Sequence, residues 1–244
     1  MRATTGPIAV GVVLAAGMGT RVGADGNKAY LPLAGRSMVS WSVRAVAETP
    51  DIDRTVLVFR RGERATAQRL LSDEVDSATV ELVEGGDTRH GSEFNVLRHL
   101  ADDIESGAVD VVLIHDAARP LAGTDLMRTA VATAREFGGA IPGLSPGDVL
   151  REAPDGSLAP VGGSLVRVQT PQAFRAAPLL AAYRAADAEG FDGTDTSACV
   201  QRFSDVDVHV FDGAATNFKV TFSHDIEVAA RLLRDRFSGD DAPR

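Results

Sequence analysis

The sequence predicts an α/β fold in which a mostly parallel, twisted sheet is covered by helices on both faces. Apolar runs with little polar alternation recur along the 244 residues, and such runs are typical of strands that are buried on both faces. Segments of helical periodicity lie between most of these runs, as they do when a crossover helix follows each strand. With 44% hydrophobic and 24% charged residues, the chain can bury a full core.

Eight apolar runs are the candidate strands. They lie at residues 8–16, 54–59, 78–83, 109–115, 138–143, 165–169, 206–213 and 217–222. Ligands of parallel sheets bind in the crevice beyond the carboxyl ends of the strands. The polar residues that directly follow these runs are therefore the first candidates for a functional site.

Six segments are candidate helices, and two of them have a candidate capping residue. Ser37 can cap a helix over 38–48, which carries its apolar residues on one face. Thr124 can cap a helix over 125–137, which ends before a pair of glycines. The other segments are 62–72, 91–106, 176–189 and 223–238.

Residues 143–164 interrupt this alternation, are rich in glycine and proline, and form most of a predicted arm at about 143–166. Within them, "VLREAPDGSLAPV" predicts a short hairpin with Asp155 and Gly156 at its turn. An exposed hairpin is marginally stable alone, so we expect this arm to pack on a second subunit in a homodimer. No repeat or linker is evident, which predicts one domain over 1–244, a Rossmann-like three-layer sandwich with a protruding β-hairpin arm.

Composition limits where the protein works and what it binds. No run of about 18 apolar residues and no secretory signal is evident, so we expect a cytoplasmic protein that does not enter membranes. Cys199 is the only cysteine, which excludes an internal disulfide and a cysteine-based metal cluster. A net charge of −9 argues against nucleic-acid binding. Any anionic ligand must therefore be held by a local cluster of cations.

A glycine-rich loop follows the first candidate strand, in "VLAAGMGTRVGADGNKAYLPL" at residues 12–32. Gly17 and Gly19 allow the backbone to approach a ligand and to expose successive N–H groups, which is how such loops hold phosphate. Arg21 and Lys28 can then neutralise the bound anion. The stretch therefore predicts a phosphate-binding loop.

Lysine is scarce in this chain, which makes its two positions informative. Lys28 and Lys219 are the only lysines, whereas 23 residues are arginine. An ammonium group is a compact point charge and a guanidinium is a planar fork, so a site that needs the former cannot simply take the latter. The loop itself is neither a dinucleotide fingerprint, since Val22 stands at the third glycine position, nor a P-loop, since no GK[ST] follows.

Further motifs follow the loop in a fixed order. They are "LAAGMGTR", "NKAYLPLAGRSMVSWSV", "GGDTRHGS", "IHDAARPL", "VQTPQAF", "GTDTSA" and "NFKVT". Over nearly the whole chain, this series resembles the 2-C-methyl-D-erythritol 4-phosphate cytidylyltransferase family, one of the nucleotidyltransferases that activate phosphorylated sugars and polyols. The resemblance implies transfer of CMP from CTP to 2-C-methyl-D-erythritol 4-phosphate, with release of pyrophosphate, in isoprenoid precursor biosynthesis.

The resemblance also implies a role for particular residues. The implied catalytic residues are Arg21, Lys28 and Lys219. The implied nucleotide-binding residues are Ala15, Ala16, Gly17, Gly19, Gly86, Asp87 and Ser92. The implied acceptor-binding residues are Asp116, Asp148, Thr170, Thr194 and Asp195. Asp116 can also hold Mg²⁺, because this ion is usually bound by one or two carboxylates together with substrate phosphates.

The implied chemistry needs no strong general base. The acceptor phosphate, which attacks the α-phosphorus of CTP, is already largely ionised near neutral pH, since its second pKa is about 6. The sequence contains only five histidines and no Ser-His-Asp or Cys-His arrangement, which agrees with this mechanism. What remains is to align two polyanions and to stabilise charge on the α-phosphoryl group.

The arm departs from the family pattern on the acceptor side. Val149 replaces a threonine that the family points at the acceptor, and Arg151 replaces a lysine. Gly162 stands where the family carries an arginine that grips the acceptor phosphate. Glycine cannot make this contact, and Arg167 or Arg151 are the nearby candidates to replace it.

Three further positions depart from the pattern. Asn27 replaces the proline before the loop lysine, which is a small change in loop stiffness. Thr196 and Gln201 stand where the family usually has acidic residues. The CTP half of the site is thus intact, whereas the acceptor half is partly rewritten.

Two other functions remain open on the sequence. The altered arm is compatible with a relative that uses CTP on another polyol phosphate, such as ribitol 5-phosphate. A nucleotide-binding regulator without turnover is the third alternative. Retention of Arg21, Lys28, Asp116 and Lys219 together argues against the regulator.

Overall fold

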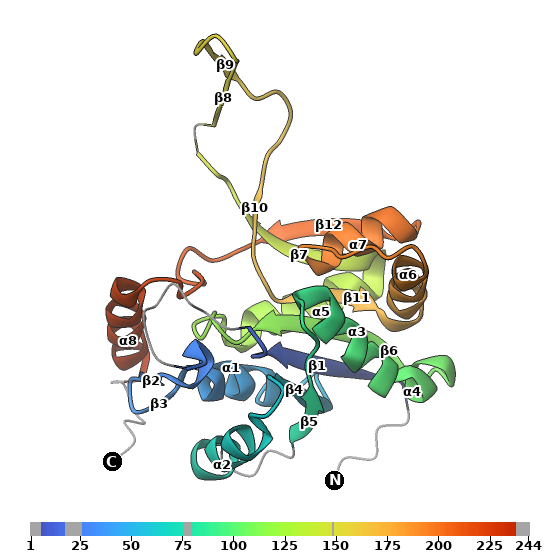
Figure 1. The fold of residues 1–244 in the computed structure, drawn as a ribbon, viewed down its shortest axis with the longest axis vertical. Coiled ribbons are helices and arrows are strands. Elements are labelled where there is room, and N and C mark those ends of the chain that lie inside the picture. Colours follow the sequence, from blue (N-terminus) through green and yellow to red (C-terminus); the bar gives the residue numbers. More distant parts are fainter. Residues whose placement is uncertain (1–5, 18–25, 76–79, 148, 238–244) are drawn as a thin grey trace.

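The computed structural model describes residues 6–17, 26–75, 80–147 and 149–237. Its central sheet has eight strands, and seven of them follow the order β10-β7-β11-β6-β1-β4-β5, while β12 pairs with β7 (Figure 1). The strands are β1 (Ile8–Leu14), β4 (Arg54–Phe59), β5 (Val80–Glu84), β6 (Val109–Asp116), β7 (Gly138–Leu144), β10 (Arg167–Val168), β11 (Gln172–Arg175) and β12 (Asp207–Asp212). The pairings β1 with β4, β1 with β6, β4 with β5 and β7 with β12 are parallel. Strand β11 is antiparallel to both β6 and β7, and β10 is antiparallel to β7. Four of the seven pairings among the described strands of this sheet are parallel, so the sheet is mostly parallel, as predicted.

Helices cover both faces of this sheet. They are α1 (Met38–Ala47), α2 (Arg64–Glu74), α3 (Arg89–His99), α4 (Ala101–Glu105), α5 (Gly123–Phe137), α6 (Ala176–Ala188), α7 (Thr196–Phe203) and α8 (Ser223–Phe237). Alternate strand residues explain the layers: Ala9 and Val13 of β1 pack with α1, α2 and α5, whereas Val10 and Val12 pack with α3, α4, α6 and α7. The three-layer α/β sandwich predicted from the apolar runs is thus confirmed.

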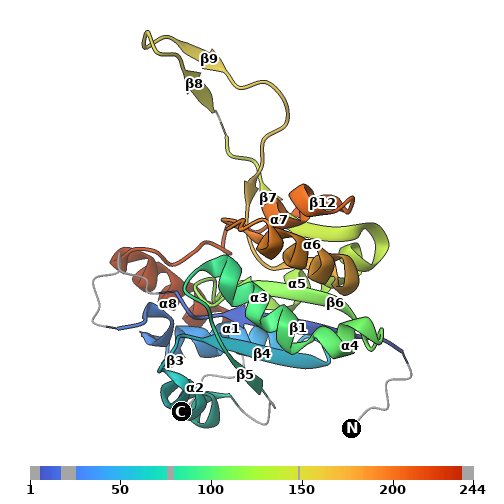
Figure 2. The same cartoon turned by 45° about the vertical axis from the view of Figure 1, so that its right-hand side comes forward.

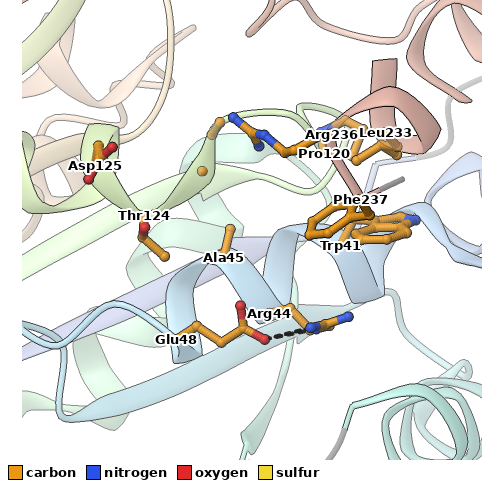
Figure 3. A pocket seen from close by; sticks show the side chains of 12 residues that line it. Trp41, Arg44, Ala45, Glu48, Pro120, Thr124, Asp125, Leu233, Arg236 and Phe237 are labelled. Carbon is orange, nitrogen blue, oxygen red and sulfur yellow. Dashed lines mark hydrogen bonds and ion pairs between the residues drawn. The ribbon is translucent and has the colours of Figure 1, made fainter. Parts of the chain in front are cut away.

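A third apolar cluster lies beside the sheet and supports two loops of the site. It joins Trp41 of α1 and Leu233 of α8 to Ala118, which follows β6, and to Val220, which precedes α8. The rings of Trp41 and Phe237 stack at a centroid distance of 5.1 Å. Figure 3 shows this stack at the wall of a hollow of about 320 Å³ between α1, α8 and the start of α5. Among the described residues, none of those predicted to bind substrate lines this hollow.

The predicted helices are found, with one wrong cap. Ser37 caps α1, since its side chain accepts a hydrogen bond from the backbone N–H of Ser40. Thr124 does not cap α5: this helix begins at Gly123 with Ala122 in the capping position, so Thr124 lies within its first turn. The segment 91–106 is divided into α3 and α4.

The strand predicted at 217–222 is wrong. The structure has no strand there, and the segment contacts the loop after β6 through one backbone hydrogen bond, from Val220 N to Ala118 O at 2.8 Å. Phe218 and Val220 pack in the cluster with α1 and α8 instead of forming a ladder. Elements that the apolar pattern did not predict are the short helix η2 (Lys28–Tyr30), α7, β2 (Pro32–Leu33), β3 (Arg36–Ser37) and β11.

The hairpin predicted within the arm is present. Strands β8 (Leu150–Glu152) and β9 (Leu158–Pro160) pair antiparallel, and they stand away from the rest of the molecule (Figures 1 and 2). At the turn, Asp155 Oδ1 accepts a hydrogen bond from Ser157 N at 2.9 Å, and Gly156 adopts a φ of +80° that favours glycine. Across the described ranges, the helices include none long and apolar enough to span a membrane.

Candidate functional site

A cleft of about 300 Å³ opens at the carboxyl ends of β1, β5 and β6. This is where ligands of parallel sheets bind. Nine residues predicted from the sequence line it: Ala15, Ala16, Gly17, Lys28, Gly86, Asp87, Ser92, Asp116 and Lys219. Segments that lie as far apart in the sequence as 15–17 and 219 are thus brought to one hollow.

The first wall of the cleft is held by Asn27. Its side chain caps η2 by accepting a hydrogen bond from Ala29 N at 3.0 Å. Its Nδ2 group donates to Ala15 O at 2.6 Å and to Glu63 Oε2 at 2.9 Å. Asn27 is buried, so these contacts fix the end of β1 against the start of η2. The residue that departs from the expected proline therefore positions the loop lysine through hydrogen bonds.

The two lysines of the chain meet across the cleft. Lys28 Nζ donates to the backbone oxygen of Val220 at 3.0 Å, directly beside Lys219. Lys219 Nζ lies 2.8 Å from Asp116 Oδ2. Since both ammonium groups line the same hollow, they can act together on one anionic ligand.

Asp116 ends β6 and is held between two cations. Arg89 Nη1 contacts its Oδ1, and Lys219 Nζ contacts its Oδ2. Burial alone would raise the pKa of Asp116, but the charges of Arg89 and Lys219 outweigh burial and hold this pKa well below the ordinary value of an aspartate. The carboxylate is therefore ionised at any physiological pH.

Thr170 and His115 fix the backbone behind Asp116. Asp116 N donates to Thr170 Oγ1 at 3.0 Å, and the same hydroxyl lies 3.1 Å from His115 Nδ1. His115 Nε2 lies 3.0 Å from the backbone oxygen of Arg119. Burial lowers the pKa of His115 to about 4, so its ring is neutral near pH 7. Thr170 was predicted to bind the acceptor, and in the structure its hydroxyl joins β6 to the segment before β11.

Close packing explains the glycines of the "GGDTRHGS" motif. A Cβ on Gly85 would lie 2.5 Å from Ala16 Cβ, and one on Gly86 would lie 2.7 Å from the backbone carbon of Gly91. Gly86 N donates to Ser92 Oγ at 3.1 Å, so this amide and this hydroxyl serve the loop itself.

The carboxylate of Asp87 stands at the open side of the cleft. Its side chain is 91% exposed and lies 3.7 Å from Arg61 Nη1. A ligand can reach this carboxylate without breaking a buried ion pair. Asp116, in contrast, is paired with Arg89 and Lys219. It is thus the part of the motif best placed to meet a base from outside.

The other predicted residues that the structure describes do not line this cleft. Thr194 is exposed, and Asp195 caps α7 by accepting a hydrogen bond from Ala198 N at 2.8 Å. Arg21, Gly19 and Asp148 lie outside the described residues. The part of the chain that the structure describes contains no group of three or more His, Cys, Asp or Glu side chains arranged to hold a metal ion.

Arg89 is a site residue that the sequence interpretation missed. It lies on α3, lines the cleft and contacts Asp116. The available signal was its charge, because it is the one cation in a motif otherwise made of small, acidic and imidazole side chains. Burial disfavours its charged form, but Asp116 and Glu93 outweigh this effect and raise the pKa of Arg89 further above its usual value.

Comparisons with known proteins agree with this geometry. Residues 9–235 match the family model described as 2-C-methyl-D-erythritol 4-phosphate cytidylyltransferase. A curated protein of that name from Cereibacter sphaeroides is 37% identical over 224 residues, which cover 91% of this chain and 95% of the relative. One from Clostridium perfringens is 30% identical over 228 residues, covering 92% and 98%.

Solved structures give the same result for the fold. The 4-diphosphocytidyl-2C-methyl-D-erythritol synthase of Anaerococcus prevotii superposes with a TM-score of 0.80 at 26% identity, covering 93% of this chain and 96% of that one. The 2-C-methyl-D-erythritol 4-phosphate cytidylyltransferase of Thermus thermophilus superposes with a TM-score of 0.69 at 27% identity, covering 93% and 100%.

Proposed function

The chain belongs to the 2-C-methyl-D-erythritol 4-phosphate cytidylyltransferase family, and from that premise we propose how its residues carry out the reaction. The protein is a cytidylyltransferase that transfers CMP from CTP to 2-C-methyl-D-erythritol 4-phosphate in isoprenoid precursor biosynthesis. The observation that carries the proposal is the convergence of Lys28, Lys219 and Asp116 on one cleft.

The reaction joins two polyanions. An oxygen of the acceptor phosphate forms a bond to the α-phosphorus of CTP, the bond from that phosphorus to the bridging oxygen breaks, and pyrophosphate leaves. The nucleophile is ionised near neutral pH, so the protein does not have to remove a proton from it. Catalysis then consists of alignment and charge stabilisation.

Lys28 and Lys219 supply the positive charge in this proposal. Lys28 reaches the cleft from η2 and is held beside Lys219 by the backbone oxygen of Val220. Lys219 is paired with Asp116 and can turn from this carboxylate to a phosphate oxygen. Such donors act most strongly on charge that develops in the transition state, in a site from which water is excluded. Arg21, which lies outside the described residues, would add a further cation in this proposal.

The nucleotide occupies the wall formed by Ala15, Ala16 and Gly17, where the backbone at the end of β1 is open to the cleft. A Cβ on Gly17 would meet no other described residue within 4 Å, so this glycine leaves room for a ligand. The base extends toward Asp87, with Gly86 and Ser92 shaping the loop behind it.

The acceptor lies on the opposite side, near Asp116 and Thr170. Its hydroxyl groups can donate to the carboxylate of Asp116, which is ionised and faces the cleft. Thr194, Asp195 and the arm residue Asp148 complete this half in the proposal.

Nucleotidyltransferases generally use a divalent metal, and the residues of the cleft fit Mg²⁺. Asp116 is a buried carboxylate at the cleft, and one carboxylate together with triphosphate oxygens is a usual set of ligands for this ion. Since Arg89 and Lys219 already contact both of its oxygens, one of them must move for the ion to bind directly. When bound, Mg²⁺ would neutralise charge on the triphosphate.

The arm supports a proposed homodimer. Leu150 is 53% exposed and Leu158 is 63% exposed, and apolar side chains of this size are stabilised when a partner covers them. In this proposal residues 1–244 form one domain, and its arm at about 143–166 contacts a second copy. Cys199, a free and buried cysteine, is consistent with a reducing cytoplasm.

A pyrophosphate-release assay with CTP and Mg²⁺ tests the function. We expect release with 2-C-methyl-D-erythritol 4-phosphate and much slower release with ribitol 5-phosphate. Faster release with ribitol 5-phosphate would favour a different acceptor, and tight CTP binding without release from either would favour a regulator. The altered arm, with Gly162 and Val149, is the reason for including the second acceptor.

A further inference from the structure

A buried carboxylate lies behind the site. Glu93 is on α3, one turn after Arg89, and only 1% of it is exposed. Its Oε1 lies 3.1 Å from Arg89 Nε in an ion pair whose N–H is not aligned for a hydrogen bond. Arg89 in turn contacts Asp116, and Asp116 contacts Lys219. Two carboxylates and two cations therefore alternate from the core to the cleft.

Two hydroxyl groups hold Glu93 in place from other helices. Thr196 Oγ1 of α7 donates to its Oε1 at 2.7 Å, and the Tyr183 hydroxyl of α6 donates to its Oε2. Thr196 and Tyr183 are themselves fully buried. Burial raises the pKa of Glu93, while Arg89 and the two hydroxyl groups favour its charged form.

Stability alone does not explain a carboxylate at this position. Taking a charged pair out of water costs several kcal/mol per ion, and replacing such a pair by apolar residues is often neutral or stabilising. A buried pair that lies next to the cleft and contacts one of its residues therefore points to a positioning role. An arginine side chain has many rotamers. Here Glu93 holds Arg89 at Nε while Asp116 contacts Nη1, so the pair with Glu93 fixes the guanidinium from the side opposite Asp116.

Position 196 gives the second line of argument. Thr196 stands where the resemblance to the family implies an acidic side chain, and its hydroxyl donates to Glu93. Since Thr196 Oγ1 and Glu93 Oε1 are 2.7 Å apart, an acidic side chain on α7 would bring its carboxylate to nearly the same place. Glu93 on α3 thus has the carboxylate that Thr196 on α7 lacks.

We propose that Glu93 is a positioning residue of the active site: it supplies from α3 the carboxylate that position 196 lacks, and it holds Arg89 where Arg89 orients Asp116. The inference rests on the role of Asp116 proposed above. It makes Arg89 and Glu93 one unit, although only Arg89 lines the cleft.

The test compares Glu93→Gln with the double variant Glu93→Ala/Thr196→Glu, which returns a carboxylate from the other helix. For Glu93→Gln we expect kcat to fall roughly 10- to 100-fold, the range for loss of a partner that orients a reactive group. The Kd of CTP, measured by calorimetry, should change much less. The double variant should recover most of the lost kcat, which a purely structural role of Glu93 would not require.

Controls separate positioning from packing. Cys199→Ala on α7 removes buried volume close to Glu93 and should lower the unfolding temperature while kcat is kept. Wild-type kcat for Glu93→Gln would overturn the proposal. So would a folded double variant whose kcat stays 10- to 100-fold low, and this second result decides the matter even when Glu93→Gln does not fold.

Failure of the proposed function is seen separately. Wild-type turnover is measured first with 2-C-methyl-D-erythritol 4-phosphate and then with other polyol phosphates. If only another acceptor is used, the assigned substrate is wrong, and the same ratios of kcat between the variants are measured with that acceptor.

Discussion

The proposed nucleotide side and the proposed acceptor side of this protein are built differently. On the nucleotide side, Ala15 and Gly17 follow β1 and Gly86 follows β5, and the sheet brings the ends of these strands to one cleft with β4 between them. On the acceptor side, Thr194 and Asp195 lie beyond the cleft, and the arm stands away from the body. One half of the site is thus fixed by the fold, and the other depends on segments that the fold leaves exposed.

This difference matches the departures from the family pattern only in part, because Asn27 and Thr196 also depart from it and are buried. The glycines and lysines of the cleft follow the pattern. The replacements at Val149 and Gly162 lie on the arm. A residue packed against its neighbours from several elements resists change, because each contact would have to be rebuilt. Exposed arm residues are free of this constraint, so acceptor contacts can change without harm to the fold.

The largest expected effect is on the nucleotide side. Lys28→Ala removes an ammonium group that lines the cleft beside Lys219, and we expect turnover to fall by roughly 10²–10³-fold, the usual effect of losing one such stabiliser. Steady-state release of pyrophosphate measures it. Arg69→Ala, which removes an exposed cation on α2, is the control and should leave turnover unchanged. Near-normal turnover of Lys28→Ala would remove this lysine from the mechanism.

The next effect concerns His115, which joins the two sides through Thr170 and Arg119. Burial lowers its pKa to about 4 in the folded protein, from 6.5 in the ordinary state. The unfolded chain therefore binds more protons between these values, and folding stability is lost as the pH falls from 6.5 to 4. The loss is about 1.4 kcal/mol per pH unit over this window.

Thermal unfolding of the wild type and of His115→Gln across this range checks the prediction. The stability of the variant should fall less steeply with falling pH than that of the wild type, because glutamine does not titrate. Equal slopes for the two proteins would show that the histidine is not held neutral by burial.

The sequence predicted the sheet and the cleft well because both depend on local patterns. Apolar runs without alternation indicated the strands, and glycines after them marked the loops that approach one another. Arg89, and Glu93 in the role proposed for it, were not predicted because they make their contacts with Asp116, Tyr183 and Thr196, which are distant in sequence. The segment 217–222 was misassigned because an apolar run looks the same whether it pairs in a sheet or packs between α1 and α8.

A smaller effect is expected from the arm. The double variant Leu150→Ser/Leu158→Ser replaces two apolar side chains by polar ones where we propose that a second subunit packs, so the dimer should dissociate. Light scattering coupled to gel filtration gives the mass, and kcat/KM for the acceptor should fall by about tenfold, which corresponds to about 1.4 kcal/mol. CTP affinity should be unchanged, since the described part of the nucleotide wall contains no arm residue. A double variant with the mass of the wild type would contradict the role of the arm.

The smallest expected effect is a gain in affinity for the acceptor. It tests whether the replacement of an arginine by Gly162 weakens the hold on the acceptor phosphate. Among the described residues, a Cβ at this position would meet nothing within 4 Å, so Gly162→Arg can be made without crowding the backbone there. If the acceptor phosphate passes this point, a guanidinium there adds a charge-assisted hydrogen bond, and the KM of the acceptor should fall by up to about tenfold. Gly163→Arg is the matched control, because it adds the same charge one residue away, where a φ of +87° disfavours any side chain. Equal KM values for both variants and the wild type would mean that the phosphate is already fully held by other cations, with Arg167 and Arg151 the next to be replaced.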